Sequence, residues 1–424
     1  MADQVQFRGG TSAQHATFTG AVREITVDTD KHVTVVHDGA TAGGFPLLRQ
    51  DLGNLPANSI TANMLVAGLI DPMSFLKADS QTPAFVKTSA STISVKAGTY
   101  ATVAGVSVAF SVQTPVVMPG TFPTGDYAIY VCTDGTIRAD SSTSAPTGYT
   151  TANSRKIGGF HNGAVSPGTT VAGGSFATTG NGMIWTQPDV DNIAGINMFS
   201  IWDLKFRPKT ADPRGMVLVD NQLWVDIYLC STDTDANGTS KYGSNVASGS
   251  VLPKIPVVFG GNGTATYPSL NWWVANELAR AQKKRLMWYH EFVTAAFGVT
   301  ENQSYDAGST TIASTGRYAG FTSKYGIEQA TGCQNTWLLE SNYYGEAASP
   351  GSTWKTVDGN TGASGSERGS INTFGTYGWT RGVAGGARSQ SGTNAGSRNI
   401  SFAYPWNTGW MYGLRAACEH SIVA

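Results

Sequence analysis

The chain has 424 residues, enough for two or three domains, and its formal charge is only −1, from 28 Lys and Arg against 29 Asp and Glu. This balance gives no acidic or basic field of the kind that nucleic acid or membrane binding requires, so neither partner is predicted. Charged residues are only 13% of the chain and Gly contributes 51 residues, which is typical of a turn-rich, mainly β protein, while 41% apolar content excludes a disordered chain.

The N-terminal half predicts short strands. Ile25 and Val27 alternate with polar residues, and Val33 and Val35 resume the alternation after a polar turn, which indicates a β-hairpin. Residues 51–79 are rich in Asn, Pro and Asp, with a weak helical patch at 64–69, and are interpreted as a connector that packs against a neighbouring chain. From 84 to 172, β-branched runs at 93–95, 106–112 and 127–131 are separated by turn residues, which predicts a β-sandwich or small barrel.

The C-terminal half begins near residue 180, since all eleven Trp lie at or after Trp185. Strands are predicted at 216–219 and 223–229. Helical spacing predicts one helix capped by Ser269 and ending at the basic residues 283–285, and a second helix over 289–297 that stops at Gly298. From there to the end, we expect ordered loops with few regular elements.

The two ends of the chain carry a resemblance to known proteins. The segments VQFRGGT (5–11), EITVDTDK (24–31) and VHDG (36–39) resemble the N-terminal module of many phage tail fibres. The segments KRL (284–286), GGAR (385–388), GSR (396–398) and GLR (413–415) resemble the C-type lectin-like fold shared with formylglycine-generating enzymes. Together with WDLKFRP (202–208), DPRGM (212–216) and ACEH (417–420), they make the chain similar to the phage major tropism determinants, a family of tail-fibre receptor-binding proteins diversified by retroelements.

The resemblance implies a mainly β, multi-domain fibre protein that forms a homotrimer. Its implied layout is a β-prism for trimerisation and tail attachment at 1–50, a connector at 51–83, a β-sandwich at 84–180 and a C-type lectin-like α+β domain at 181–424. The implied partners are a bacterial surface protein or glycan and other phage tail proteins. The protein would be made in the host cytoplasm and reside in the tail fibre of the virion. The N-terminus has no apolar segment that would serve as a secretory signal, and no membrane insertion is expected.

The candidate receptor-binding surface lies between residues 385 and 412. Rigid aromatics interleaved with short polar groups and Gly are typical of binding surfaces. The predicted contact residues are Arg388, Gln390, Asn394, Asn399, Ser401, Ala403, Tyr404, Trp406, Asn407, Gly409, Trp410 and Tyr412. The alternative is that Phe402, Trp406 and Trp410 belong to the core of the domain. Gly386, Gly396, Arg398, Gly413 and Arg415 are interpreted as scaffold residues.

Catalytic and metal chemistry find little support in the sequence. The four cysteines show no C-x-x-C spacing and are expected to be buried free thiols, although Cys333 and Cys418 could meet in one domain. Formylglycine-type chemistry needs a second cysteine near the C-terminus, so no enzyme is predicted. Asp233, Asp235 and Asn237 match the first half of a calcium loop, but Ser244 stands where a bidentate Glu belongs, so a polar turn is favoured over calcium, and no cofactor is predicted.

The sequence therefore predicts a tail-fibre tip that binds a bacterial receptor through its C-terminal domain. Two alternatives remain open at this stage: a structural or adaptor fibre protein without a receptor, and an enzyme that trims a surface polysaccharide.

Overall fold

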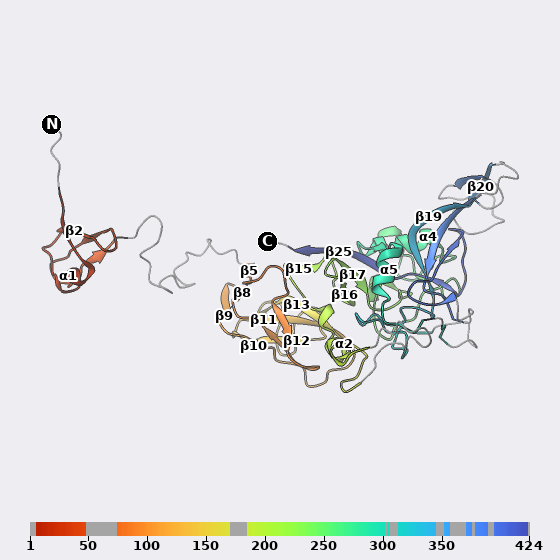
Figure 1. Cartoon of the computed structure of the whole chain (residues 1–424), viewed down its shortest axis with the longest axis horizontal. Coiled ribbons are helices and arrows are strands. Elements are labelled where there is room, and N and C mark those ends of the chain that lie inside the picture. The colour runs from red at the N-terminus through yellow and green to blue at the C-terminus, as the bar shows by residue number, and fades with distance from the viewer. Residues whose placement is uncertain are drawn as a thin grey trace. The chain divides into compact units, whose positions relative to one another are not determined.

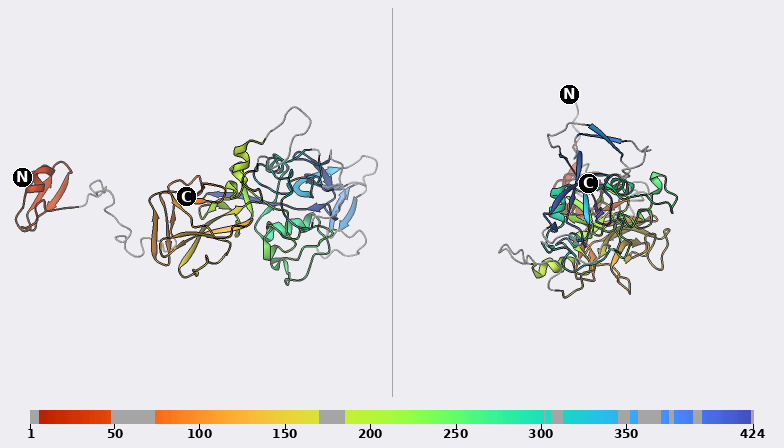
Figure 2. Two further views of the ribbon diagram at one scale, coloured as in Figure 1. Left: turned by 90° about the horizontal axis from the view of Figure 1, so that it is seen from below. Right: turned by 90° about the vertical axis from the view of Figure 1, so that its right-hand side faces the viewer.

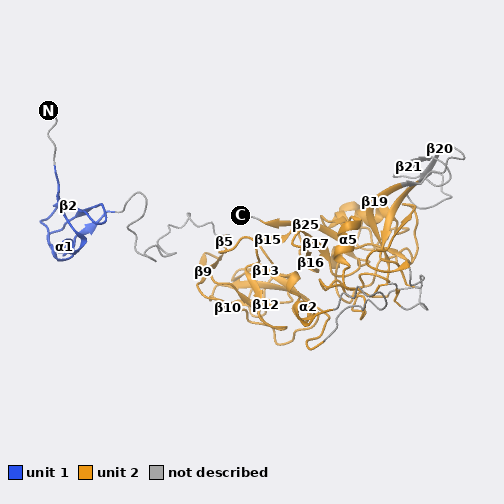
Figure 3. Ribbon diagram, viewed as in Figure 1, with its two compact units in different colours: residues 1–71 blue, residues 72–424 orange. Residues whose placement is uncertain are grey.

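The computed structural model describes residues 6–47, 74–169, 185–301, 303–305, 313–344, 352–356, 370–374, 378–388 and 394–422. The chain divides into two compact units, residues 1–71 and 72–424 (Figure 3). Both are built mainly from strands with few helices, as predicted (Figure 1). Within the described ranges, the helices are too short or too polar to cross a bilayer.

The first unit is a four-stranded sheet with one short helix. Its elements are β1 (Arg8–Gly10), α1 (Ser12–Thr17), β2 (Ile25–Asp28), β3 (Val33–Val36) and β4 (Phe45–Pro46), and the strand order is β1-β2-β3-β4. Strands β2 and β3 are antiparallel, which confirms the predicted hairpin. Helix α1 begins with a capping box between Thr11 and Gln14.

The inner face of β2 is polar. Thr26 is buried, and its hydroxyl lies 2.8 Å from both His15 Nε2 and His37 Nε2. The side chain of Ile25 is 40% exposed instead. Hydrogen bonding to the two imidazoles lets the hydroxyl occupy the interior, because a buried polar group with partners costs little. Val35 is already buried within the single chain, so it needs no neighbouring chain to cover it.

The first part of the second unit packs three sheets around one core. Their strand orders are β5-β8-β9, β10-β7-β6 and β12-β11-β13-β14. The strands are β5 (Phe75–Leu76), β6 (Phe85–Lys87), β7 (Ile93–Val95), β8 (Thr99–Val103), β9 (Val106–Phe110), β10 (Thr114–Pro115), β11 (Gly125–Cys132), β12 (Ile137–Asp140), β13 (Ser154–Asn162) and β14 (Trp202–Asp203). Strands β7, β9 and β11 confirm the three predicted runs. Phe85, Ile93, Ile129 and Ile157 fill the core between the sheets.

The second part of this unit is organised around the last strand of the chain. Strand β25 (Ala416–Ile422) pairs with β15 (Phe206–Pro208), β17 (Leu223–Asp226) and β18 (Arg285–Leu286), and β17 also pairs with β16 (Met216–Val219). In both figures β25 carries the C-terminus back toward the first part of the unit (Figures 1 and 2). The predicted hairpin 216–229 is confirmed, and its turn places Asp220 and Asn221 at positive φ.

Two helices pack on this sheet. The other helical elements here are α2 (Gln187–Ile193), η2 (Met198–Ser200), α3 (Thr234–Asn237) and η3 (Val257–Phe259). Helix α4 (Trp272–Ala281) is capped by Asn271, whose side chain accepts from Val274 N, so the prediction of a Ser269 cap was wrong. The helix also ends earlier than predicted. Lys283 adopts a left-handed conformation after it, and Lys284 is buried, with its ammonium 2.6 Å from Asp226 Oδ1.

Helix α5 (Tyr289–Ala295) confirms the second predicted helix, and Phe292 is buried in its core face. The prediction of few regular elements after residue 298 was wrong. That stretch contributes β19 (Asn335–Tyr344), β20 (Ser352–Thr356), β21 (Ser370–Phe374), β22 (Gly378–Ala384), β23 (Ile400–Ala403), β24 (Tyr412–Gly413) and β25. Most of the predicted connector, including the helical patch at 64–69, lies outside the described residues.

Candidate functional site

The C-terminal surface is built on one four-stranded sheet with the order β23-β22-β19-β24. Strand β23 lies at one edge of this sheet and β24 at the other, where Tyr412 pairs with Asn335 of β19. Residues 404–411 connect these two edge strands. The connecting loop therefore runs from one edge of the sheet to the other, on a support of paired strands.

The loop 404–411 is held in place by contacts within the loop and with two other segments. The rings of Tyr404 and Trp406 stack with centroids 5.0 Å apart and planes 6° from parallel. Pro405 O accepts a hydrogen bond of 3.0 Å from Trp272 N at the start of α4, and Asn407 N donates back to Tyr404 O. Gly409 O accepts from Gly249 N at 3.0 Å, where a Cβ on Gly249 would lie 2.2 Å from Gly409 N. The loop is thus a preorganised surface with stacked aromatic rings.

Beside the loop, Arg381 of β22 contacts two tryptophan rings, one from α4 and one from β22. The Arg381 guanidinium lies 3.9 Å from the ring centroid of Trp272 and 5.0 Å from that of Trp379. Burial lowers the pKa of Arg381. Trp379 is 40% exposed, and Phe402 on the neighbouring strand is 43% exposed. Phe402 lies opposite Gly382, so its side chain faces the other side of the sheet from Arg381 and Trp379. Exposed rings therefore lie on both faces of the sheet edge.

The sheet and loop rest on a buried arginine, Arg415. Its guanidinium donates to four main-chain carbonyls, those of Asp226, Ile227, Glu328 and Gln329, at 2.6–3.2 Å. Burial lowers the pKa of Arg415 to about 10. The planar guanidinium carries several donors and suits this arrangement. Arg415, which directly precedes β25, thereby ties that strand to β17 and to residues 328–329. The scaffold role predicted for Arg415 agrees with this geometry.

The chain was compared with known protein families and structures. Residues 5–41 match the family model described as the major tropism determinant N-terminal domain, and residues 83–186 match the Mtd second domain. The tail fiber receptor-binding protein of Bordetella phage BPP-1 is 47% identical over 343 residues, which are 80% of this chain and 81% of the relative. The chain belongs to the major tropism determinant family.

Solved structures of family members agree with this assignment. The I1 and M1 variants of the major tropism determinant match with a TM-score of 0.70 at 41% and 42% identity, and the U1 variant matches with 0.68 at 42%. Each comparison covers 99% of this chain and 100% of the other. The mainly β fold predicted from the sequence is therefore the fold of the family.

The predicted contact residues fall into distinct environments. Asn394 and Ser401 are exposed, and the half-buried members are Asn399, Tyr404, Trp406, Asn407, Gly409, Trp410 and Tyr412. Arg388 and Ala403 are buried in the single chain, with the Arg388 guanidinium 5.0 Å from the ring centroid of Tyr305. Gln390 lies outside the described residues.

Two of the predicted residues have structural contacts that the sequence did not reveal. Tyr412 stacks on the buried Trp337 with centroids 5.0 Å apart, so it supports the sheet edge. Arg398, interpreted as scaffold, has an exposed side chain, and its main-chain carbonyl accepts from Tyr289 OH. The sequence analysis did not include Trp379 and Arg381 among the candidate contact residues, because no pattern in the surrounding sequence predicted a strand beside β23.

The side chains of the three calcium-loop candidates form hydrogen bonds or ion pairs with other protein groups. Asp233 caps α3 and pairs with Lys254 at 2.7 Å. Asp235 Oδ2 accepts from Val257 N, and Asn237 Oδ1 accepts from Lys241 Nζ. No cluster of three or more metal-binding side chains occurs among the residues that the structure describes. Two ammonium groups on these oxygens favour the polar-turn interpretation over calcium.

All four cysteines are free and buried, which confirms the sequence expectation. The alternative of a bond between Cys333 and Cys418 is not seen. Burial raises the pKa of each thiol, to about 12 for Cys418. A raised pKa disfavours the thiolate that cysteine chemistry needs.

Proposed function

We propose that the protein is a phage tail-fibre tip that binds a receptor on the bacterial host surface. The contact surface proposed here comprises the loop 404–411 with Trp379, Arg381, Ser401 and Phe402, and is called the aromatic surface below. The observation that carries the proposal is a preorganised, partly exposed aromatic surface on a member of a family whose Bordetella phage relative is named a receptor-binding protein. The protein would accordingly be part of the virion.

The chemistry of the aromatic surface favours contact by packing and hydrogen bonding. Between residues 394 and 412, Arg398 is the only charged side chain. Aromatic rings that are already stacked lose little conformational entropy on binding, and short polar residues beside them adapt to a partner. A protein or a glycan offers apolar and hydrogen-bonding groups that could contact the aromatic surface.

We also propose the domain layout and the trimer that the family resemblance implies. The proposed layout is a β-prism at 1–50, a connector at 51–83, a β-sandwich at 84–180 and a lectin-like domain at 181–424. Phe7, Ile25, Phe45 and Leu47 are exposed on the first unit, and a module of this size rarely forms a sufficient core alone. Association of three copies would cover these side chains, and this end would attach to other tail proteins.

The oligomeric state of the full chain tests the trimer directly. Sedimentation equilibrium should give three times the mass of the chain, and replacing Phe45 by Asp should weaken the association. A stable monomer at micromolar concentration would contradict the proposal.

We propose that the protein is not an enzyme, because its relatives are named for receptor binding and its thiols are buried. Release of reducing sugar ends from host polysaccharide would contradict this. The alternative of an adaptor without a receptor predicts that the purified chain does not bind intact host cells. Diversification of the C-terminal segment predicts a near-duplicate of its coding sequence, differing at adenines, beside a reverse transcriptase gene.

The aromatic surface is tested by comparing adsorption of parent and variant. Substituting Phe402 and Asn407 by Ala should leave the melting temperature nearly unchanged and reduce binding to host cells. Trimeric display would amplify the loss, because each substitution is repeated in every copy. Unchanged adsorption by a correctly folded variant would move the receptor contact elsewhere.

A further inference from the structure

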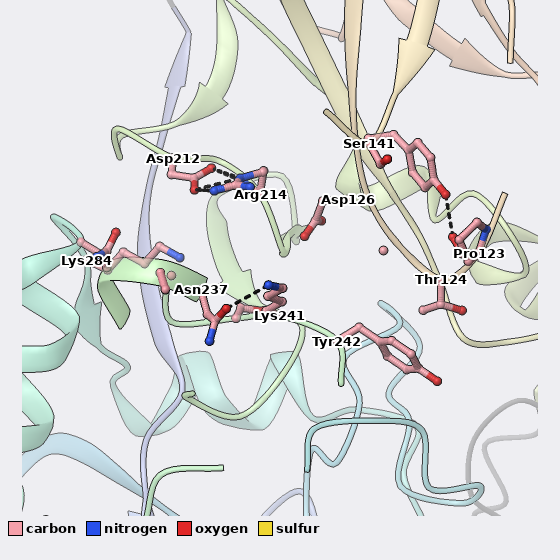
Figure 4. A pocket seen from close by; sticks show the side chains of 16 residues that line it. Pro123, Thr124, Asp126, Ser141, Asp212, Arg214, Asn237, Lys241, Tyr242 and Lys284 are labelled. Atoms are coloured by element: carbon pink, nitrogen blue, oxygen red, sulfur yellow. Dashed lines mark hydrogen bonds and ion pairs between the residues drawn. The ribbon is translucent and has the colours of Figure 1, made fainter. Parts of the chain in front are cut away.

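A polar pocket of about 300 Å³ lies where the first part of the second unit meets the C-terminal part (Figure 4). One wall comes from residues 123–127 and Ser141, and the other from residues 212, 214, 236–238, 240–242, 282 and 284. The pocket shares no residue with the aromatic surface. Its volume is at the lower end of the range of about 300–1,000 Å³ for small-ligand sites, which often lie at domain junctions.

The charges that line this pocket neutralise one another. Asp212 binds Arg214 with both carboxylate oxygens, at 2.8 and 2.9 Å from Nε, and this pairing raises the pKa of Arg214. The Lys284 ammonium lies 2.6 Å from Asp226. Lys241, the third cation of the lining, binds the amide of Asn237, and Asp126 balances its charge. Three cations therefore face three carboxylates, counting Asp226, and the pocket offers no net positive charge for an anionic ligand.

The pocket also presents hydrogen-bonding groups of both kinds and one exposed aromatic ring, that of Tyr242. Lys241 donates to Asn237 Oδ1 at 2.9 Å, which directs the amide of Asn237 along the wall (Figure 4). Thr124 supplies a hydroxyl from the opposite side in this view. Tyr242 is 41% exposed, and its ring meets Tyr228 edge-on with centroids 5.7 Å apart.

The back of the pocket is rigid. Asp126 Oδ1 accepts from Gly215 N at 2.9 Å and lies 2.8 Å from His161 Nδ1, while His161 Nε2 lies 3.0 Å from Tyr228 OH. Gly215 has a φ of 66°, and a Cβ there would lie 2.4 Å from Ser240 O. These contacts cross the junction between the two parts, so the wall is formed before any ligand arrives.

We propose that this pocket binds one neutral sugar residue of a cell-surface glycan. Sugar hydroxyls both donate and accept hydrogen bonds, as these walls do, and the C–H face of a sugar ring fits against an exposed tyrosine. A purely apolar ligand would leave the polar wall groups unpaired, which is costly. The sugar site is separate from the aromatic surface, and only its use in host contact depends on the proposed function.

The test is ligand-observed NMR on the full-length protein with D-glucose, D-galactose and N-acetyl-D-glucosamine at millimolar concentration. At least one of these sugars should show saturable binding, and Tyr242→Ala and Asn237→Ala should each weaken it by about tenfold or more. Inorganic phosphate serves as the anionic comparison and should not bind. Melting curves of both variants should stay close to the parent, because Tyr242 is exposed and the half-buried Asn237 bonds to the exposed Lys241.

Phe402→Ala is the matched control, since it removes an aromatic ring from the aromatic surface. It should bind the sugar as the parent does while losing host-cell adsorption. The sugar site is refuted if none of the sugars binds, if phosphate binds in their place, or if the two pocket variants retain parental affinity. These outcomes leave the adsorption result unaffected, so failure of the sugar site is distinguishable from failure of the receptor proposal.

Discussion

Replacing Phe by Ala at two positions of the same domain separates folding from binding. Phe292 on α5 is 1% exposed and packs in the core among Val217, Val225 and Leu338. Phe402 on β23 is 43% exposed. The chemical change is identical at both positions, so any difference in outcome reports the environment of the ring.

The expected magnitudes follow from these environments. Removing a fully buried phenyl ring costs roughly 3–5 kcal/mol, through lost burial and the cavity left behind. For a domain of about 150–250 residues, this lowers the melting temperature by roughly 6–20 °C. Phe402→Ala should stay within about 0.5–1 kcal/mol of the parent, as most surface changes do.

Thermal melting and adsorption to host cells should be measured on both variants. Phe402→Ala should melt as the parent does and adsorb poorly, whereas Phe292→Ala should lose both properties together. The reasoning is refuted if Phe402→Ala melts as low as Phe292→Ala, or if Phe292→Ala melts like the parent.

Three further predictions concern buried groups of the second unit. Burial raises the pKa of Glu328 to about 7 from an ordinary 4.5, so the folded state holds a proton that the unfolded state releases. The free energy of unfolding should be highest below about pH 4.5 and should fall by about 3 kcal/mol as the pH rises through 7. In Glu328→Gln this pH dependence should disappear. An equally steep pH dependence in that variant would contradict the assignment. Arg415→Lys should lower the free energy of unfolding in denaturant by about 1–3 kcal/mol for each buried carbonyl that loses its donor, and a neutral result would mean that the guanidinium is dispensable. An aromatic disulfide reagent should label none of the thiols in the native protein and all four after unfolding, whereas rapid native labelling would place a thiol at the surface.

Local patterns in the sequence predicted many of the elements. Alternation located the β2–β3 hairpin, two apolar runs joined by a polar turn located the β16–β17 hairpin, and helical spacing located α5. Each of these depends on neighbours close in sequence, and the local pattern of apolar and polar residues defines it. The family resemblance assigned a binding role to the C-terminal region. Composition alone showed only that this region is rich in aromatic and short polar residues.

The errors arose where distant segments decide the outcome. Strand β19 is buried at Trp337 and Leu338 in succession, so it shows no alternation and was taken for loop. Lys284 was read as a helix-end charge because its partner Asp226 lies 58 residues away. Thr26 faces inward only because His15 and His37 supply hydrogen bonds. Tyr412 and Arg388 were expected at the surface, but rings from β19 and the segment near Tyr305 contact them.

The central claim is that the aromatic surface binds a host receptor. Its most direct test is a binding isotherm of labelled, purified protein on susceptible host cells, for the parent and for a variant with Ser401, Phe402, Asn407 and Thr408 changed together. The parent should bind saturably, and the correctly folded fourfold variant should not bind. The pocket variant Tyr242→Ala should still bind, with any reduction limited to the contribution of the sugar site. Parental binding by the fourfold variant would contradict the account.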